Sequence, residues 1–529
     1  MRPYPSLIPL FLALLSLGLF SSCNRTAPID EAREQKLLLI TVGSEPSNLD
    51  PHRSTGAPES FIMSALWEAL LERNVAGTDF VPSAAARWEI SPDGRTYTFH
   101  LRPDAKWSNG EGVTARDWEQ SLKRWLNPKL AAELANFADP IVGAYDYRTS
   151  QNSDPDSVGI RAIDTHTLEL ELIEPDVMFL DRLTSYPWYP VHRASVEASG
   201  DFHDPLNNFI RPGELVSNGA YTMTAWRHNQ FVEVGRNPHY HTDTKLEGIR
   251  FFAMDHGDTE ERAFRSGQLH ITASVPASKV DVYREANNPA LLTYPRVGTR
   301  YLPCNTTRAP FDDVRVRRAF ALAINRQQMV DVVLRAGGEP AYSMVGGTGG
   351  RYQPTLLLEE SIDEARELLA QAGFPGGVGF PPVEYLYNTL GRNRQVAETL
   401  QQMWKSALNG DVTLRNEEWK VFLETRRQGD YQIARAGWLP FSAEPAELYE
   451  LNSGWSGSNE TGWSDPEYDR VLYAARQEMD TSKRHTLYHR LDEILLREQP
   501  VIPLGFYART RLVHPTVEGW PTDNMEGIV

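Results

Sequence analysis

Positive charge is scarce in this chain. Its 529 residues include 53 Lys and Arg against 70 Asp and Glu, a formal net charge of -17. Nucleic acids and anionic lipid surfaces bind positively charged patches, so this balance argues against both as partners. The excess of acidic residues favours solubility and leaves the nature of the ligand open.

Long apolar runs are also missing, except at the N-terminus. The run from Leu7 to Phe20 is apolar with small residues between, Arg2 precedes it, and Ser21 and Ser22 follow. This layout is typical of a secretory signal peptide. The run is shorter than the ~20 residues that cross a bilayer as a helix, so a permanent anchor helix is disfavoured. We therefore expect residues 1–22 to be a signal peptide and the mature chain to be exported.

Cysteine is nearly absent, since the chain has only Cys23 and Cys304. Cys23 directly follows two small residues at the expected cleavage point. This resembles a bacterial lipobox, in which the new N-terminal cysteine is lipidated, although Phe20 replaces the usual Leu. A plain signal peptide with an unrelated cysteine is the alternative. With Cys23 lipidated no internal disulfide can form, so stability has to come from buried cores.

Length and composition allow several such cores. With 41 % hydrophobic residues, the chain is expected to divide into about two to four domains. Residues 24–35 are polar and carry no apolar period, so we expect residues 23–36 to be a flexible, lipidated tether. From Leu37 the run LLLITVG predicts a short buried strand.

Strands and helices then mix without a repeating period. Tyr97–Leu101 and Thr167–Leu172 alternate apolar and polar residues, which predicts half-buried strands. Asp313–Arg326 carries apolar residues at helical spacing, and so does the stretch marked by Val396, Leu400, Trp404 and Leu408, so both are expected to be amphipathic helices. The sequence therefore predicts a mixed α/β protein.

Catalytic motifs are missing as well. The nearest approach to a nucleophile elbow, Gly454–Gly457, has wrongly spaced glycines and is expected to be a loop. Cys304 has no evident histidine partner and is expected to be buried and inert. His239 and His241 lack the frame of a catalytic zinc site, and the GGTGG run at Gly346–Gly350 lacks the Lys-Ser/Thr of a phosphate-binding loop. We expect no enzyme activity, no cofactor and no metal.

The strongest signal is a series of long runs spread over nearly the whole mature chain. They are SEPSNLDPHRSTGAPES from Ser44, LRPDAKWSNGEGVTARDW from Leu101, VSNGAYTMTAW from Val216, NTTRAPFDDVRVRRAFALAINR from Asn305 and EWKVFLETRRQGDYQIARAGW from Glu418. In this order they resemble the peptide-binding family of ABC-importer receptors, and most closely its oligopeptide-binding proteins. Any one run alone would be a weak signal, but their shared order makes it strong.

The resemblance implies the periplasmic-binding-protein fold, with two hinged α/β lobes that close over the ligand and an inserted third, accessory lobe. Such closure suits a transport receptor, because only the liganded, closed form should dock productively on an importer. The expected boundaries are residues 37–67 with 189–297 and 509–529 for lobe I, 68–188 for the accessory lobe II, and 298–508 for lobe III.

The resemblance also implies a site that binds what all peptides share, namely the main chain and the charged ends. Thr55, Gly56 and Ala57 occupy the position where the family uses backbone groups, and Gly56 would permit close approach of the ligand. Arg426 and Arg435 match arginines at the C-terminal end of the peptide site. Arginine suits a carboxylate because its planar fork offers two parallel hydrogen bonds. The alternative is that both arginines pair with carboxylates of the protein itself.

Aromatic side chains complete the implied site. Trp419 and Trp438 match pocket-lining aromatics, and Tyr507 matches a ligand-facing tyrosine near the lobe boundary. Ordinary core packing is the alternative for these side chains. Asn393 replaces a histidine that the family places near the carboxylate end.

Phe441 is the departure that matters most. The family has an aspartate there, which neutralises the free α-amino group of the peptide. Burying an ammonium group without a partner costs several kcal/mol. The ligand is therefore expected to have a blocked or displaced amine, as in cell-wall-derived peptides, or to meet Glu444 instead. Gly298 and Leu439 stand where some relatives carry a disulfide.

The functional expectation is an extracytoplasmic binding component that captures short peptides and delivers them to an ABC permease in the inner membrane. We expect a monomeric, periplasmic or cell-surface lipoprotein that touches the membrane only through Cys23. The alternatives are a receptor of the same family for an amine-blocked or non-peptide ligand such as a nickel chelate, haem, sugar or opine, a sensor that reports to a signalling protein, and an exported hydrolase.

Overall fold

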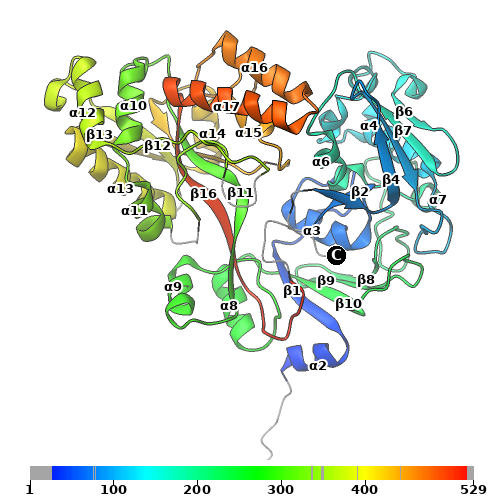
Figure 1. Cartoon of the computed structure of the whole chain (residues 1–529). Coiled ribbons are helices and arrows are strands. Elements are labelled where there is room, and N and C mark those ends of the chain that lie inside the picture. Colours follow the sequence, from blue (N-terminus) through cyan, green and yellow to red (C-terminus); the bar gives the residue numbers. More distant parts are fainter. Residues whose placement is uncertain are drawn as a thin grey trace, which may run out of the picture.

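The computed structural model describes residues 27–520, apart from positions 75, 76, 78, 335–337, 347–350, 390 and 441. The expected signal peptide, Cys23, Phe441 and all but the first glycine of the GGTGG run lie outside the described residues. Figure 1 shows a mixed α/β chain in which two long strands, β11 and β16, join two of the bodies; the mixed α/β character confirms the predicted fold class. Within the described part of the chain, no helix is both long and apolar enough to span a membrane.

The first body surrounds a four-stranded sheet in the order β1-β10-β9-β8. Its strands are β1 Leu37–Gly43, β8 Tyr221–Arg227, β9 Phe231–Arg236 and β10 Gly248–Ala253. β1 runs parallel to β10, and the other pairs are antiparallel. Leu38 and Ile40 are buried with Ile249, Phe251 and helix α3 (Ala57–Leu66), so the strand predicted from LLLITVG is confirmed. The remaining helices that follow in sequence are α7 Arg193–Ser199, α8 Gly257–Arg265 and α9 Ala277–Glu285.

The expectation of a flexible tether is wrong for part of its range. Residues Pro28–Glu34 form helix α2, which starts with proline in its first turn, a position where the missing N–H costs nothing. Ile29 and Ala32 lie on one side of this helix and are buried against Leu39 of β1. Three residues apart, they form a short apolar stripe that a sequence window dominated by charge does not reveal.

The second body has an antiparallel sheet in the order β4-β5-β7-β6. The strands are β4 Ala85–Ile90, β5 Thr96–Leu101, β6 Ile160–Ala162 and β7 Thr167–Glu171, and a hairpin of β2 Leu71–Arg73 and β3 Phe80–Pro82 accompanies them. The predicted strands at 97–101 and 167–172 are confirmed as β5 and β7. Helix α4 (Ala115–Leu126) starts with a reciprocal capping box between Thr114 and Asp117. The buried residues of this core all fall between Leu70 and Trp188, and two short helices, α5 Ala144–Arg148 and α6 Phe179–Leu183, join it.

The third body has a parallel sheet in the order β13-β12-β14, with strands β12 Val383–Asn388, β13 Val412–Glu417 and β14 Ile433–Ala434. Helix α13 (Gly391–Leu408) buries Val396, Leu400, Trp404 and Leu408, as predicted. Further helices of this body are α12 Ile362–Gln371, α14 Trp419–Arg427, α15 Ala446–Glu450, α16 Pro466–Gln477 and α17 Thr481–Glu498.

The helix predicted over Asp313–Arg326 is present but shorter. Helix α10 covers Val314–Leu322, and α11 covers Arg326–Gln328. The Asp313 carboxylate caps the first helix, while the Asn325 side chain accepts from the N–H of Gln328 and starts the second. The apolar period continues across the break, so periodicity alone could not locate it.

Two long antiparallel strands connect the first and third bodies. They are β11 (Leu291–Pro303) and β16 (Val501–Leu512), and Figure 1 shows them running from α8 and α9 up to the helices of the third body. At the lower end Ile271 bridges both Ile40 of β1 and Val513, which ties the connection to the first sheet. At the upper end a short strand, β15 (Ala436–Trp438), pairs with β11. The RAGW motif therefore lies on the edge of this connection.

Candidate binding site at the junction of β11, β14 and β15

Arg435 lies at the step between two sheets. The chain leaves β14 at Ala434 and enters β15 at Ala436, and the N–H of Arg435 donates to the carbonyl of Leu386 on β12 over 2.8 Å. This bond fixes the backbone from which the guanidinium projects. The side chain is partly buried and forms no hydrogen bond or ion pair with any residue that the structure describes. An arginine held in this way is available to an anionic ligand.

The position of Tyr507 explains why the RAGW motif has a glycine, Gly437. Gly437 on β15 faces the phenol of Tyr507 on β16, and a Cβ added at Gly437 would lie 2.2 Å from the tyrosine hydroxyl. No side chain fits there unless the ring moves. The guanidinium carbon of Arg300 lies 3.8 Å from the centre of the same ring, a cation–π contact. Tyr507 is thus held between Gly437 and Arg300.

Arg300 was not expected at this site from the sequence. It lies on β11 directly opposite Gly437. Its pKa is lowered to about 10, mainly by burial and in smaller part by the positive charges of Arg392 and Arg435, while Tyr507 has the opposite effect. Arg392 lies in the first turn of α13. We call Arg300, Arg392 and Arg435 the arginine cluster.

Arg426 has a partner within the protein. It lies near the end of α14, and its guanidinium forms an ion pair with the carboxylate of Glu460 and stacks over Phe422 at 5.3 Å. The sequence had left open whether the matched arginines face the ligand or pair internally. In this conformation Arg426 is paired internally and Arg435 is not.

The predicted aromatic side chains differ in their surroundings. Trp419 begins α14 with 46 % of its surface exposed and stacks on Phe422. Trp438 is partly buried against the core that includes Tyr301, and its indole N–H donates to Glu447 over 3.1 Å. Trp419 is therefore accessible to a ligand, whereas Trp438 also has a packing role.

The segment Thr55–Ala57 lies at the start of α3. Thr55 and Ala57 are exposed, and Gly56 is the N-cap residue with extended backbone angles. A Cβ at Gly56 would lie 2.0 Å from the carboxylate of Glu59. The space beside Gly56 is thus occupied by a side chain of the protein, that of Glu59, which accepts bonds from the N–H and hydroxyl of Ser47. No hydrogen bond or ion pair between described residues joins this segment to the arginine cluster.

Asn393 and Glu444 both have internal partners. The amide of Asn393 donates to the side-chain oxygen of Asn388 over 2.8 Å. Glu444 is only 3 % exposed; it accepts from Arg484 over 3.1 Å and from the hydroxyl of Tyr488 over 2.5 Å. The nearby carboxylate raises the pKa of Tyr488 well above its usual value, in addition to the larger effect of burial. A ligand amine would have to displace these partners to reach Glu444.

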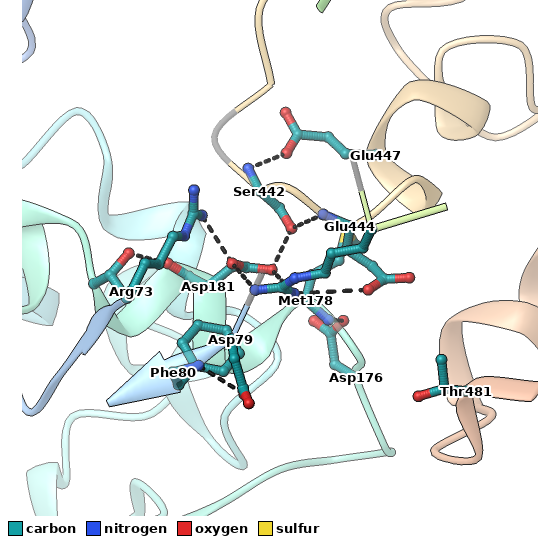
Figure 2. A network of polar contacts seen from close by, with 12 residues as sticks. Arg73, Asp79, Phe80, Asp176, Met178, Asp181, Ser442, Glu444, Glu447 and Thr481 are labelled. Carbon is teal, nitrogen blue, oxygen red and sulfur yellow. Dashed lines mark hydrogen bonds and ion pairs between the residues drawn. The ribbon is translucent and has the colours of Figure 1, made fainter. Parts of the chain in front are cut away.

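Ser442, which follows β15 in the chain, is tied to the second body. Figure 2 shows the carboxylate of Asp181, on α6, at the centre of this contact. It accepts from the hydroxyl of Ser442 over 2.7 Å, from both terminal nitrogens of Arg351 over 2.9 and 3.1 Å, and is paired with Arg73 at 2.8 Å. We call these residues the Asp181 cluster. No sequence signal pointed to it, because its members come from segments far apart in the chain.

Residues whose type could suggest catalysis or metal binding have structural surroundings in this protein. Cys304 is fully buried, and burial raises the pKa of its thiol to about 12, so it is not a nucleophile at neutral pH. His241 lies 2.8 Å from the carboxylate of Glu68. The stretch Gly454–Gly457 is a loop, as predicted. Gly298 and Leu439, which stand where some relatives carry a disulfide, are close together in space, because a Cβ at Gly298 would lie 2.8 Å from the leucine side chain. Among the described residues no group of His, Cys, Asp and Glu could hold a metal ion.

Comparison with known proteins assigns this arrangement to a class. The family model described as "Bacterial extracellular solute-binding proteins, family 5 Middle" matches residues 79–460. The periplasmic murein peptide-binding protein MppA of Escherichia coli K12 is 31 % identical over 506 residues, 94 % of this chain and 92 % of its own. The periplasmic oligopeptide-binding protein OppA of Salmonella typhimurium is 32 % identical over 528 residues, 97 % of this chain and 95 % of its own.

A solved structure gives the same result. The unliganded open form of MppA matches with a TM-score of 0.84 at 31 % identity, and the match covers 94 % of this chain and 96 % of that one. The protein is therefore a solute-binding protein of the multi-lobed α/β kind. It belongs to family 5 of the bacterial extracellular solute-binding proteins, which confirms the relationship predicted from its motifs.

Proposed function

We propose that this protein is the extracytoplasmic substrate-binding component of an ABC importer and that it binds short peptides at Arg435. The observation that carries the proposal is the guanidinium of Arg435, which projects from a backbone fixed by a hydrogen bond to Leu386 and has no hydrogen-bond or ion-pair partner among the described residues. Leaving such a charge partly buried and unpaired is unfavourable, so a bound carboxylate would stabilise it. The names of its relatives, which include a murein peptide-binding and an oligopeptide-binding protein, support a peptide as the ligand.

We further propose the lobes given by the resemblance: residues 37–67, 189–297 and 509–529 as lobe I, 68–188 as lobe II, and 298–508 as lobe III. Closure would occur by bending at β11 and β16, because these long strands connect lobe I with lobe III. The exposed residues Thr55, Ala57 and Trp419 would then approach the ligand from opposite lobes. The similarity to an unliganded open form supports an open conformation for the structure described here.

The test is calorimetry with short peptides whose C-termini are either free acids or amides. Arg435→Ala should weaken binding of the free acids by more than ~1.5 kcal/mol, the range for a hydrogen bond to a charged group, and should barely change binding of the amides. Arg427→Ala is the matched control, because Arg427 is on α14 nearby but is exposed and paired with Glu424. Equal losses for acids and amides would show that Arg435 has a structural role and would contradict the proposal.

A second ligand class is supported by one observation. Phe441 replaces the aspartate expected there, and Glu444, the other carboxylate considered for a ligand amine, is already bound by Arg484 and Tyr488. We propose that the preferred peptide has a blocked or displaced amine. Acetylation of the peptide should then cost no affinity, whereas a strong preference for the free amine that Glu444→Gln leaves unchanged would exclude both this version and the role of Glu444.

Localisation and assembly complete the proposal. The mature protein would be a monomer tethered to the membrane through lipidated Cys23, and its only other partner would be the permease. Mass spectrometry of the N-terminal peptide from the native host tests the lipid. Cys23→Ser should release a soluble protein, and an unmodified N-terminus in the wild-type protein would contradict the tether.

A further inference from the structure

The arginine cluster holds more positive charge than one ligand terminus can neutralise. Like Arg435, Arg300 and Arg392 form no ion pair or hydrogen bond through their side chains with any described residue. All three side chains are partly buried. Three cations in one neighbourhood repel one another, and that repulsion has to be offset by a ligand or tolerated as a cost in stability.

The carboxylates on the adjoining elements have other partners. Glu460 pairs with Arg426, Glu447 accepts from Trp438 and from the N–H of Ser442, and Glu417 pairs with Arg415 at 2.6 Å. These carboxylates are therefore not available to neutralise the arginine cluster. Because the protein is acidic overall, this lack of available carboxylates is specific to the region and does not follow from composition.

Arg392 is placed where a cation is unfavourable for the helix itself. It is the second residue of α13, an 18-residue helix whose N-terminal N–H groups carry the positive end of the helix dipole. Arg394, close by on the same helix, is exposed and bound to Glu398 at 2.8 Å. Unlike Arg394, Arg392 forms no ion pair with an acidic side chain among the described residues.

Arg300 also lacks an acidic partner in the described part of the chain and contacts an aromatic ring instead. It lies on the central strand of the β15-β11-β16 sheet, with its guanidinium over the ring of Tyr507, and the charges of Arg392 and Arg435 reach it. The ring stabilises the cation but supplies no hydrogen-bond acceptor in the plane of the guanidinium, so the fork of donors remains available.

We propose that the ligand is an acidic peptide with a second carboxylate close to the terminal one, bound by Arg300 and Arg392 beside Arg435. This inference rests on the proposed function, since it assumes that Arg435 binds the peptide terminus. It specifies the ligand class: peptides that bear a side-chain carboxylate near the C-terminal end are preferred over isosteric neutral peptides.

The experiment is calorimetry with pairs of tripeptides that differ only in Glu against Gln. Ala-Ala-Glu is compared with Ala-Ala-Gln, and Ala-Glu-Ala with Ala-Gln-Ala, each with a free and an acetylated amine. For at least one pair the Glu peptide should bind about tenfold or more tightly, the size expected for a charge-assisted hydrogen bond. Arg300→Gln and Arg392→Gln should each bring that ratio close to one, with little change for the Gln peptide.

Arg394→Gln is the matched control, because it removes the same charge from the same helix end and should leave the ratio unchanged. Arg392→Gln should also keep or raise the melting temperature, which separates a lost contact from a lost fold. Ratios near one for every pair in the wild-type protein would overturn the inference while leaving peptide binding intact. An equal effect of Arg394→Gln and Arg392→Gln would also overturn it, because total charge would then be the cause.

A free anion is the competing occupant. Excess sulfate should weaken the Glu peptides more than the Gln peptides if the second carboxylate occupies the arginine cluster. If sulfate binds there and no Glu peptide is preferred, the cluster serves an inorganic anion and the inference fails. If none of the tripeptides binds in any form, the proposed function itself fails, an outcome distinct from both.

Discussion

Asp181→Asn is the perturbation that the structure makes most informative about stability. The carboxylate of Asp181 is fully buried and is the shared partner of Arg73, Arg351 and Ser442 (Figure 2). The substitution keeps the shape of the side chain but removes its charge. One acceptor oxygen becomes an NH2 group that points at guanidinium donors.

The expected loss can be worked out from burial. Removing one partner of a buried ion pair typically costs about 3–5 kcal/mol, because the opposite charge is left uncompensated. The side chains of Arg73 and Arg351 are 18 % and 14 % exposed, so water partly solvates both, and Arg351 retains Glu444 at 3.8 Å. We therefore expect a loss of about 2–4 kcal/mol in the free energy of unfolding.

The assay is urea unfolding followed by tryptophan fluorescence. Asp139→Asn serves as the control in the same body, because Asp139 pairs with Arg148 but both side chains are more exposed, at 30 % and 24 %. That substitution should cost less than about 1 kcal/mol. The reasoning is refuted if Asp181→Asn costs no more than the control, since burial and charge would then not determine the contribution of this cluster.

Two further predictions concern pH and the binding site. His52 is buried, accepts from Arg124 over 2.8 Å and contacts the carbonyl of Tyr189, and burial with the charge of Arg124 lowers its pKa to about 3. Below about pH 6.5 the imidazole of His52 is protonated in the unfolded chain but stays neutral in the folded protein. Lowering the pH should therefore lower the free energy of unfolding by up to about 1.4 kcal/mol per pH unit. The stability advantage of wild type over His52→Gln, measured by urea unfolding at about pH 7 and about pH 5, should shrink on acidification; a constant difference would contradict the assignment. Gly437→Ala should displace Tyr507 and weaken peptide binding at least tenfold in calorimetry with the fold retained by circular dichroism, and unchanged affinity would show that the tyrosine does not contact the ligand.

Local sequence determined the regular elements. Alternation predicted β5 and β7, a run of apolar residues predicted β1, and a four-residue period predicted the buried stripe of α13. These patterns depend only on which face of an element is buried, and neighbouring residues fix that face. They failed where a cap or a short packed stripe decided the outcome, at the end of α10 and in α2.

The candidate site was predicted only in part. The motifs located Arg435, Tyr507 and Trp438, which the structure brings together at β11, β15 and β16. They could not reveal that Arg426 pairs with Glu460, or that Glu444 is bound by Arg484. The choice between a ligand and an internal partner depends on which charges the fold brings within a few ångströms, and this pairing has no local pattern.

Sequence by itself thus determined the family and the order of elements, because both are written in short runs whose meaning does not depend on distant residues. Only the tertiary structure decided which charged side chains come together at the site without an acidic partner that the structure describes. Arg300, Arg392 and Arg435 come from separate strands and a helix start, and only the fold gathers them near one another and away from unoccupied carboxylates. Electrostatic interactions act through space, so their balance is set by the folded arrangement.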